Sequence, residues 1–228
     1  MILSLDKIAG KKVLITAGPT RENIDDVRFI SNYSTGKMGY AIAEAAFSAG
    51  AEVILVTGPV SLKCSEGINR IDVISAEDMY QETVKHFTNS NIAILSAAVA
   101  DYTPAEPVSG KLKKDSLGDS PIIKLKKTKD ILAELGKIKT KNQFLVGFAL
   151  ESENVIENAK EKLIRKNCNM LIANQAGKEL SGFGGDFNTI TIIRSDNTIT
   201  DYLPMTKDDC AKVILNSVCE MIGYLKLE

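Results

Sequence analysis

The chain has little of what metal centres, membrane spans and nucleic-acid-binding surfaces are built from. Its only histidine is His86, and its four cysteines, Cys64, Cys168, Cys210 and Cys219, show no CxxC spacing, so we expect all five to be structural. No stretch approaches the roughly 18 apolar residues of a membrane span, and the first residues are too charged for a signal peptide. The formal net charge of −1 argues against broad contact with nucleic acid. We therefore expect a cytoplasmic protein without a protein-built metal site.

What the sequence does contain is typical of an ordinary globular protein, and 228 residues with 44% hydrophobic side chains predict one domain over residues 1–228. Short apolar, β-branched runs alternate with helical patterns, which favours a mostly parallel sheet covered on both faces. We predict strands at 12–17, 52–56, 70–74, 91–95, 143–148 and 170–174, and helices at 36–49, 76–87, 129–138, 154–166 and 207–225, with Ser75 capping the second helix.

Two further segments modify this α/β alternation. Residues 189–193 and 198–200 flank a turn and predict an antiparallel hairpin at one edge of the sheet. Residues 104–110 carry two prolines and a glycine, so they should be irregular and should present the lysines that follow them on a flap. Residues 121–125 alternate well enough to form its far strand. The expected fold is therefore a Rossmann-like three-layer α/β fold with a flap and an antiparallel edge hairpin.

A long polar loop begins at Gly18 and joins the first strand to the first helix. A loop of this length at the carboxyl end of a strand is a probable ligand site, because ligands gather at this edge in open α/β sheets. The fourth strand ends in Ser96-Ala97-Ala98, and small side chains there allow a ligand to approach the backbone. We therefore place the candidate site between these two segments.

Familiar nucleotide motifs do not fit this loop. A P-loop requires a hydroxyl residue after Gly36-Lys37 and a glycine five residues before Gly36, but the chain has Met38 and Ser31. The loop contains no G-x-G-x-x-G fingerprint. Tyr33 and Lys37 have the spacing found in short-chain dehydrogenases, but they precede the first helix instead of lying on a later one.

Five separated motifs instead match one family in order along almost the whole chain, and on these motifs the chain resembles phosphopantothenoylcysteine synthetase. The motifs are Gly18-Pro19-Thr20-x-Glu22-x-Ile24-Asp25-x-Val27-Arg28, Ile30-Ser31-Asn32-x-Ser34-x-Gly36-Lys37-Met38-Gly39, Ala97-Ala98-Val99-Ala100-Asp101-Tyr102, Lys111-x-Lys113-Lys114 and Val146-Gly147-Phe148. In many bacteria this domain follows a flavin-dependent decarboxylase in one chain, and the present sequence resembles the stand-alone bacterial form.

The resemblance implies a ligase of coenzyme A biosynthesis. A nucleotide, CTP in most bacterial members, activates the carboxylate of 4′-phosphopantothenate as an acyl-cytidylate, and the amine of cysteine then displaces CMP. The residues alone do not distinguish CTP from ATP. Mg²⁺ would shield the triphosphate and would be held mostly by the nucleotide, because Mg²⁺ commonly keeps several waters. The resemblance also implies a homodimer in which the flap reaches a neighbouring subunit, and association with a separate decarboxylase.

The resemblance assigns the catalytic roles to three residues. Asn32 would hold the acyl group through an amide that cannot attack the activated ester, Arg28 would grip phosphate or acyl oxygen as a planar fork, and Lys111 on the flap would neutralise phosphate charge. Asn32 and Lys111 are expected to converge on a single acyl-phosphate ester. The alternatives are that Asn32 caps the first helix and that the flap lysines form a solvated surface.

Nucleotide contacts are implied for a further set of positions. Asp101 would accept hydrogen bonds from the ribose or the base, Phe148 would stack on the base, and Lys162 and Lys166 would meet the triphosphate from one helix face. Phe148 could instead be a core aromatic, and the lysine pair could be an exposed helix face. The family commonly has Asn-Pro before an Asp-Ile pair, whereas this chain has Thr128-Lys129 before Asp130-Ile131. The remaining implied contacts are Gly18, Ser34, Ala97, Ala98, Lys111, Thr128, Lys129, Asp130 and Ile131.

Two other classes of function were weighed against the ligase. An NAD(P)-dependent reductase would use the same scaffold, but the missing glycine fingerprint and the misplaced Tyr33–Lys37 pair count against it. A non-catalytic nucleotide-binding module would have no reason to carry Asn32 together with Lys111. Pyrophosphate release distinguishes the ligase from both alternatives.

Overall fold

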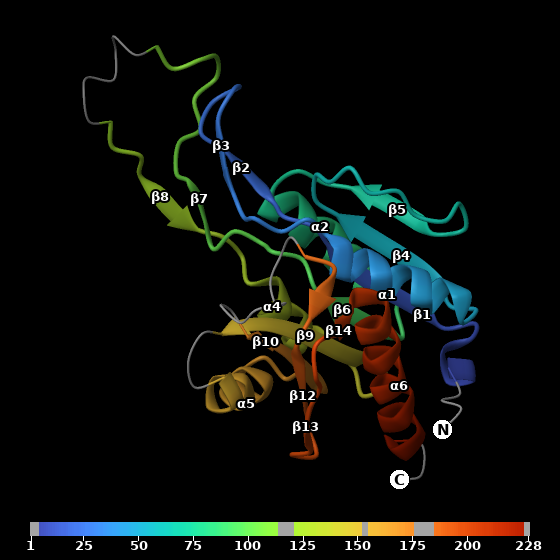
Figure 1. Cartoon of the computed structure of the whole chain (residues 1–228). Helices are drawn as coiled ribbons and strands as arrows, with labels where there is room; N and C mark the ends of the chain where they lie inside the picture. The colour runs from blue at the N-terminus through green and yellow to red at the C-terminus, as the bar shows by residue number, and fades with distance from the viewer. Residues whose placement is uncertain (1–4, 114–120, 152–154, 176–184, 226–228) are drawn as a thin grey trace.

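A computed structural model describes residues 5–113, 121–151, 155–175 and 185–225, and its centre is one eight-stranded sheet (Figure 1). The strands from β10 to β5 are parallel to their neighbours, β12 runs antiparallel to β10, and β13 runs antiparallel to β12. The predicted fold class and edge hairpin are thus confirmed. The spatial order is β13 (Ile199–Asp201), β12 (Ile190–Arg194), β10 (Met170–Gln175), β9 (Phe144–Glu151), β6 (Ile92–Leu95), β1 (Lys12–Ala17), β4 (Glu52–Thr57) and β5 (Asn69–Asp72).

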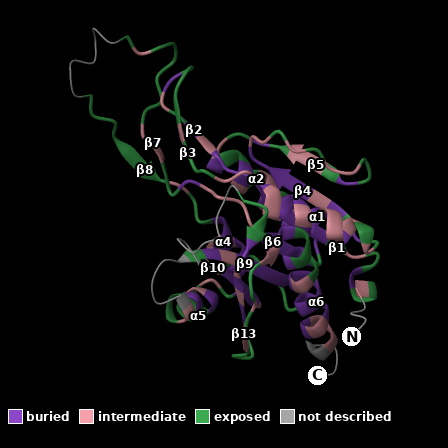
Figure 2. Ribbon diagram, viewed as in Figure 1, coloured by how far each residue is buried: buried purple, intermediate pink, exposed green. Residues whose placement is uncertain are grey.

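Helices cover both faces of the sheet, because successive apolar side chains of a strand point to opposite faces. In β1, Val13 and Ile15 pack with the helices of one face, whereas Leu14 packs with those of the other. The first layer contains η1 (Leu5–Ile8), α1 (Lys37–Ser48) and α6 (Lys207–Leu225), and the second contains α2 (Ala76–Phe87), α4 (Ile131–Ile138) and α5 (Val155–Arg165). Buried segments concentrate in the sheet and on the inner helix faces (Figure 2).

The helix starts follow from local chemistry. The Ser75 hydroxyl accepts a hydrogen bond from Asp78 N, and the Asp78 carboxylate accepts one from Ser75 N, so the predicted cap of α2 is confirmed as a full capping box. At α1 the N-cap is Gly36 at φ 80°, with no side-chain cap bond. The alternative that Asn32 caps the first helix is therefore wrong. A Cβ on Gly39 would lie 2.5 Å from Ala17 Cβ, so this glycine lets α1 approach β1 closely.

The segment predicted as a loop from Gly18 to the first helix contains an antiparallel hairpin of β2 (Arg21–Asn23) and β3 (Phe29–Ser31). The sequence did not indicate it, because both strands are short and lie outside the main sheet. A second small pair, β11 (Phe187–Asn188) with β14 (Met205–Thr206), was also missed. Residues 176–184 and 114–120, which include Lys114 of the fourth motif, lie outside the described residues.

The flap differs from the prediction in register. Residues 121–124 are not a strand. Instead β8 (Leu125–Lys127) pairs antiparallel with β7 (Tyr102–Pro104), which was expected to be irregular at its end. β8 is exposed along its whole length (Figure 2), so no buried face marks its register in the sequence. From this pair the described residues extend away from the sheet, beside the β2–β3 hairpin (Figure 1).

Candidate functional site

The candidate site lies at the carboxyl ends of β1 and β6. The chain places β4 and β5 on one side of β1 and then crosses to β6 on the other, which makes this the switch point where open α/β sheets bind ligands. Here Ser96 Oγ donates to Thr16 O at 2.7 Å, and Thr20 Oγ1 accepts from Ala100 N at 3.0 Å. These bonds hold the segment after β6 in an extended form, with its backbone open to a ligand.

A cavity of about 460 Å³ opens at this edge, and Thr16 and Leu95 form its floor. It brings together residues from four separate stretches of the sequence that the family resemblance assigns to nucleotide binding. Those residues are Ala97, Asp101, Thr128, Lys129, Asp130, Ile131, Phe148, Lys162 and Lys166. Phe148 lies at the cavity wall and is half-buried, so it is not a fully enclosed core residue.

The two lysines of the α5 region line this cavity and are not an open helix face. Lys162 Nζ donates to Phe148 O at 3.0 Å, and the Lys166 side chain is 12% exposed and forms an ion pair with Asp130. Asp130 also caps α4 by accepting from Ala133 N at 2.9 Å. Burial opposes ionisation of Asp130, but the Lys166 ammonium and the Ala133 N–H outweigh it, so the pKa of this carboxyl lies below its ordinary value.

A smaller cavity of about 150 Å³ adjoins the first, and Ala97 and Phe148 line both. Ser34 and Ala98 belong to this smaller cavity together with the first turn of α1. Gly18 lies behind that turn, because a Cβ on Gly36 would be 3.3 Å from Gly18 Cα.

Three polar side chains of the smaller cavity were missed by the sequence analysis, namely Asn174, Asn188 and Lys207. Asn174 stands at the end of β10, so the carboxyl-end rule could have identified it. Asn188 and Lys207 come from β11 and the start of α6, and no local pattern connects them with the site.

Asn32 lines neither cavity but lies beside the segment that follows β6. Its Nδ2 donates to Ala98 O at 3.0 Å, and the same carbonyl oxygen accepts from Thr20 N at 3.2 Å. The amide is exposed and is fixed beside the segment that both cavities share.

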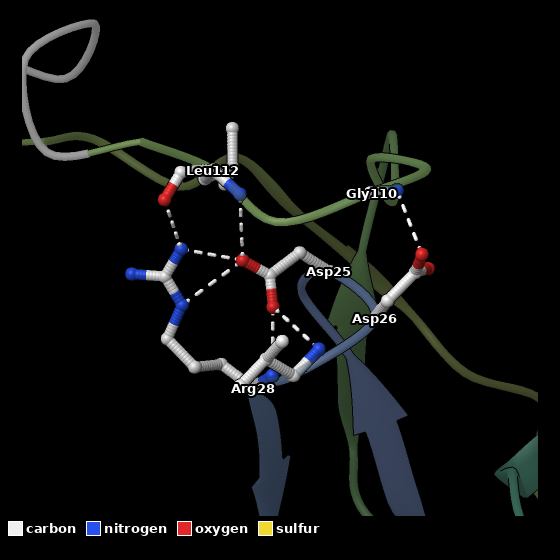
Figure 3. Close-up of polar contacts among 6 residues, drawn as sticks. Asp25, Asp26, Arg28, Gly110 and Leu112 are labelled. Carbon is white, nitrogen blue, oxygen red and sulfur yellow. Dashed lines mark hydrogen bonds and ion pairs between the residues drawn. The ribbon is translucent and has the colours of Figure 1, made fainter.

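Arg28 lies elsewhere, where the β2–β3 hairpin contacts the flap (Figure 3). The buried Asp25 carboxylate accepts from the Arg28 guanidinium and from Leu112 N, and Arg28 donates to Leu112 O at 2.9 Å. The Arg28 guanidinium holds the pKa of the Asp25 carboxyl well below its usual range. The Arg28 guanidinium thus donates to Asp25 and Leu112 of its own chain.

The flap is tied to the β2–β3 hairpin at a second point, where Gly110 N donates to Asp26 at 2.8 Å (Figure 3). Lys111, between the two tied residues, is exposed and lines neither cavity. Within one chain, therefore, the structure does not bring Lys111 to Asn32, because the hairpin tip holds this part of the flap away from the sheet.

Within the described ranges, no group of three or more histidine, cysteine or acidic side chains is placed to hold a metal ion. Cys168, Cys210 and Cys219 are buried and Cys64 is partly buried, and none of them forms a disulfide. In the same part of the chain no helix has the length and apolar character needed to cross a membrane.

The fold and the cavity at the switch point place the chain in the Rossmann-like class of α/β domains. A family profile described as "DNA/pantothenate metabolism flavoprotein C-terminal domain" matches residues 8–222, and the chain belongs to this family. The family resemblance inferred from the motifs is thus confirmed.

Known proteins similar to the chain include "Coenzyme A biosynthesis bifunctional protein CoaBC" of Bacillus subtilis (strain 168), which is 46% identical over 94% of this chain and 52% of that protein. A "Cysteine/Cysteine sulfinic acid decarboxylase" from an unknown prokaryotic organism is 49% identical over 93% of this chain and 59% of that protein. The chain therefore spans about half the length of the curated relatives it matches. The crystal structure of the C-terminal domain of a CoaBC protein has a TM-score of 0.81 and 41% identity, covering 96% of this chain and 98% of that chain.

Proposed function

We propose that the chain is a phosphopantothenate–cysteine ligase of coenzyme A biosynthesis. It would activate the carboxylate of 4′-phosphopantothenate with a nucleotide, CTP by family habit, and join the acyl group to cysteine with release of CMP and pyrophosphate. One observation carries the proposal: residues that the family resemblance assigns to the nucleotide, scattered from position 97 to position 166, line a single cavity. The cytoplasmic location, and a separate flavin-dependent decarboxylase that would consume the product, belong to the same proposal.

The larger cavity would hold the nucleotide. Asp101 is exposed at its rim, where a carboxylate can accept hydrogen bonds from ribose hydroxyls, and Phe148 presents a ring for stacking on the base. Lys162 and Lys166 lie on one side of the cavity and would face the phosphates. Their positive charge would offset the repulsion between the incoming carboxylate and the triphosphate.

Asn32 would hold the acyl carbonyl of the activated intermediate. Its bond to Ala98 O fixes the amide next to Ala97, which lines both cavities, so one end of the intermediate would lie with the nucleotide and the other near the smaller cavity. An amide can donate to the carbonyl oxygen without attacking the ester. This placement would keep the acyl carbon open to an amine that approaches from the smaller cavity.

Mg²⁺ would be held mainly by the triphosphate. The carboxylates that line the larger cavity are Asp101 and Asp130, and Asp130 already serves Lys166 and Ala133 N. A site with one available carboxylate fits an ion that keeps several waters and binds through phosphates. The ion would shield the charge of the triphosphate, while Lys162 and Lys166 would orient the phosphates.

We further propose a homodimer in which the flap of one subunit reaches the cavity of its neighbour. The support is that Lys111 lines neither of the two cavities among the described residues, while Asp25 and Asp26 hold the flap outward. Mixing two inactive variants, Asn32→Asp and Lys111→Gln, tests this. If the flap acts on its neighbour, each mixed dimer has one intact site and activity returns; if the mixture stays inactive, the flap acts within its own chain.

The ligase itself is tested by pyrophosphate release from phosphopantothenate with CTP or ATP, with and without cysteine. If neither nucleotide gives pyrophosphate release, the ligase proposal is wrong, and NADPH oxidation by the same protein would favour the reductase.

We expect Asn32→Asp to accumulate the activated intermediate and release CMP poorly, whereas unchanged turnover would refute the role of Asn32. We expect Lys111→Gln to slow the first half-reaction, and normal pyrophosphate release would count against it.

A further inference from the structure

Lys129 lines the larger cavity, but the partners of its ammonium lie outside that cavity. Its Nζ donates to Glu77 Oε1 at 2.7 Å and lies 4.3 Å from the centroid of the Tyr80 ring. Glu77 and Tyr80 stand at the start of α2, and neither of them lines the larger or the smaller cavity. An ion pair and a cation–π contact therefore draw the Lys129 side chain toward α2.

This side chain belongs to a wall of the larger cavity. Residues 128–131 line the cavity and join the flap to α4. Thr128 fixes the beginning of the wall, because its Oγ1 donates to Ala100 O at 2.6 Å, and Asp130 fixes the end as the cap of α4. The Lys129 side chain adds an attachment to α2 between these two points. Loss of that attachment should loosen the surface on which we place the nucleoside.

The start of α2 also holds the β2–β3 hairpin. Glu22 of β2 is 3% exposed, and its Oε1 accepts from Ala76 N at 2.8 Å. Beside this bond, Arg21 N donates to Ile74 O at 2.8 Å. A buried acceptor bonded to the first N–H of a helix is costly to lose, and a carboxylate is favoured at this end of the helix dipole. Since β3 ends one residue before Asn32, these bonds fix the strand that carries the acyl-binding amide.

The start of α2 is itself well fixed. The capping box of Ser75 and Asp78 closes its first turn, and the buried Met79 packs into the core on this face of the sheet. Gln81 Nε2 donates to the same Glu77 oxygen that meets Lys129, at 3.1 Å. The Lys129 ammonium lowers the pKa of the Glu77 carboxyl, so the pair stays charged at neutral pH.

We propose that residues 75–80 form a brace that holds the two halves of the candidate site in a fixed relative position. Glu77 acts on the nucleotide wall through Lys129, and Glu22 acts on Asn32 through the hairpin. Both glutamates are positioning residues that do not touch substrate. The inference rests on the ligase function, in which the carboxylate and the α-phosphate must meet in a near-attack geometry.

Titration of the full-length protein with CTP and with cytidine, at one fixed ionic strength, tests the nucleotide half of the brace. In Lys129→Met and in Glu77→Gln we expect the Kd for both ligands to rise by the same factor of about two to five, which is the scale of an exposed ion pair. The double variant should bind no more weakly than either single variant, because all three lose one contact. Lys129→Arg keeps both attractions and should bind nearly as wild type.

The matched control is Lys85→Met, which removes an exposed ion pair with Glu82 from the same helix and should bind as wild type. Tighter CTP binding in Glu77→Gln, or weakening of CTP alone in Lys129→Met, would show that the Lys129 ammonium is a phosphate contact. Unchanged Kd values, or additive losses in the double variant, would also overturn the brace.

The hairpin half is tested by turnover. Glu22→Met removes the acceptor and Glu22→Asp shortens it by one methylene, so both lose the bond to Ala76 N, whereas Glu22→Gln keeps an oxygen there. In whichever of the first two folds, we expect the kcat of pyrophosphate release to fall about tenfold or more with the KM for CTP unchanged, and Glu22→Gln to retain most of the activity. An unchanged kcat, or a raised KM for CTP alone, would refute the role of Glu22.

Failure of the brace and failure of the ligase proposal give different results. The titrations need no turnover, so they decide the role of Glu77 even in a protein that releases no pyrophosphate. Absence of pyrophosphate release from wild-type protein would refute the ligase, whereas normal release with unchanged nucleotide binding in Glu77→Gln would refute the brace alone.

Discussion

Replacing Lys162 by methionine should weaken binding of the nucleotide through its phosphates and leave binding of the nucleoside unchanged. In the structure Lys162 is half-buried at the wall of the larger cavity and donates to Phe148 O at 3.0 Å. An ammonium has three donors, so this bond can persist while another donor meets a phosphate oxygen. The substitution therefore removes a phosphate contact without a compensating gain in the free protein.

A hydrogen bond to a charged group contributes about 1.5–3 kcal/mol, which corresponds to a factor of about 10 to 150 in Kd. Since the side chain is partly solvated, we expect the low end of this range, about tenfold. The loss should shrink as salt concentration rises, because exposed charges are screened. No comparable loss is expected for cytidine, which has no phosphate.

Isothermal titration of the full-length protein with CTP and with cytidine, at one fixed ionic strength, measures both values. The matched control is Lys137→Met on α4, because the Lys137 side chain is 72% exposed and pairs with Glu134 at 3.2 Å, away from the cavity. Equal weakening of CTP and cytidine would show that Lys162 supports the cavity wall and contacts no phosphate. An unchanged Kd for CTP would refute the placement of the triphosphate.

Three further predictions follow from the contacts in the structure and from the directions of the pKa shifts. Asp130→Asn should tighten CTP binding a few-fold in the same titration, because it removes a negative charge from the cavity and releases Lys166 from its ion pair. An asparagine can still cap α4, so the helix start should persist. Weaker CTP binding would contradict this prediction. Alkylation at pH 8 should modify Cys64 first, because burial raises the pKa of Cys168 and of Cys210 to about 12, and mass spectrometry should find these two modified only in denaturant. Because the unfolded chain loses these two protons at lower pH than the folded chain does, stability should fall as pH rises from about 9 towards 12, and a flat stability profile there would refute the shifts.

The sequence predicted the main sheet well because its strands are buried on both faces and therefore appear as continuous apolar runs. β1 was predicted with the correct bounds, and the helices were placed within about two residues; at α2 the capping residue Ser75 marks the start. The exposed strands β2, β3, β7 and β8 were missed or shifted, since short strands without a buried face carry no hydrophobic period.

The candidate site was predictable where it depends on motifs and unpredictable where it depends on distance. Asp101, Phe148, Lys162 and Lys166, which the family resemblance assigns to the nucleotide, line one cavity, and their nucleotide contacts stay a prediction. The motifs did not indicate that Arg28 turns its fork toward Asp25 and the flap, because the partner Leu112 lies 84 residues away.

The sequence alone determined a parallel sheet covered by helices on both faces, because that depends on local periodicity. It also determined membership of one family, because that depends on short motifs. Only the folded structure decided which charged groups meet. Lys37 and Asp186 are 149 residues apart and still form an ion pair beside Lys207 and Asn188. No local pattern encodes that meeting, since it depends on α6 packing next to α1 on the same face of the sheet.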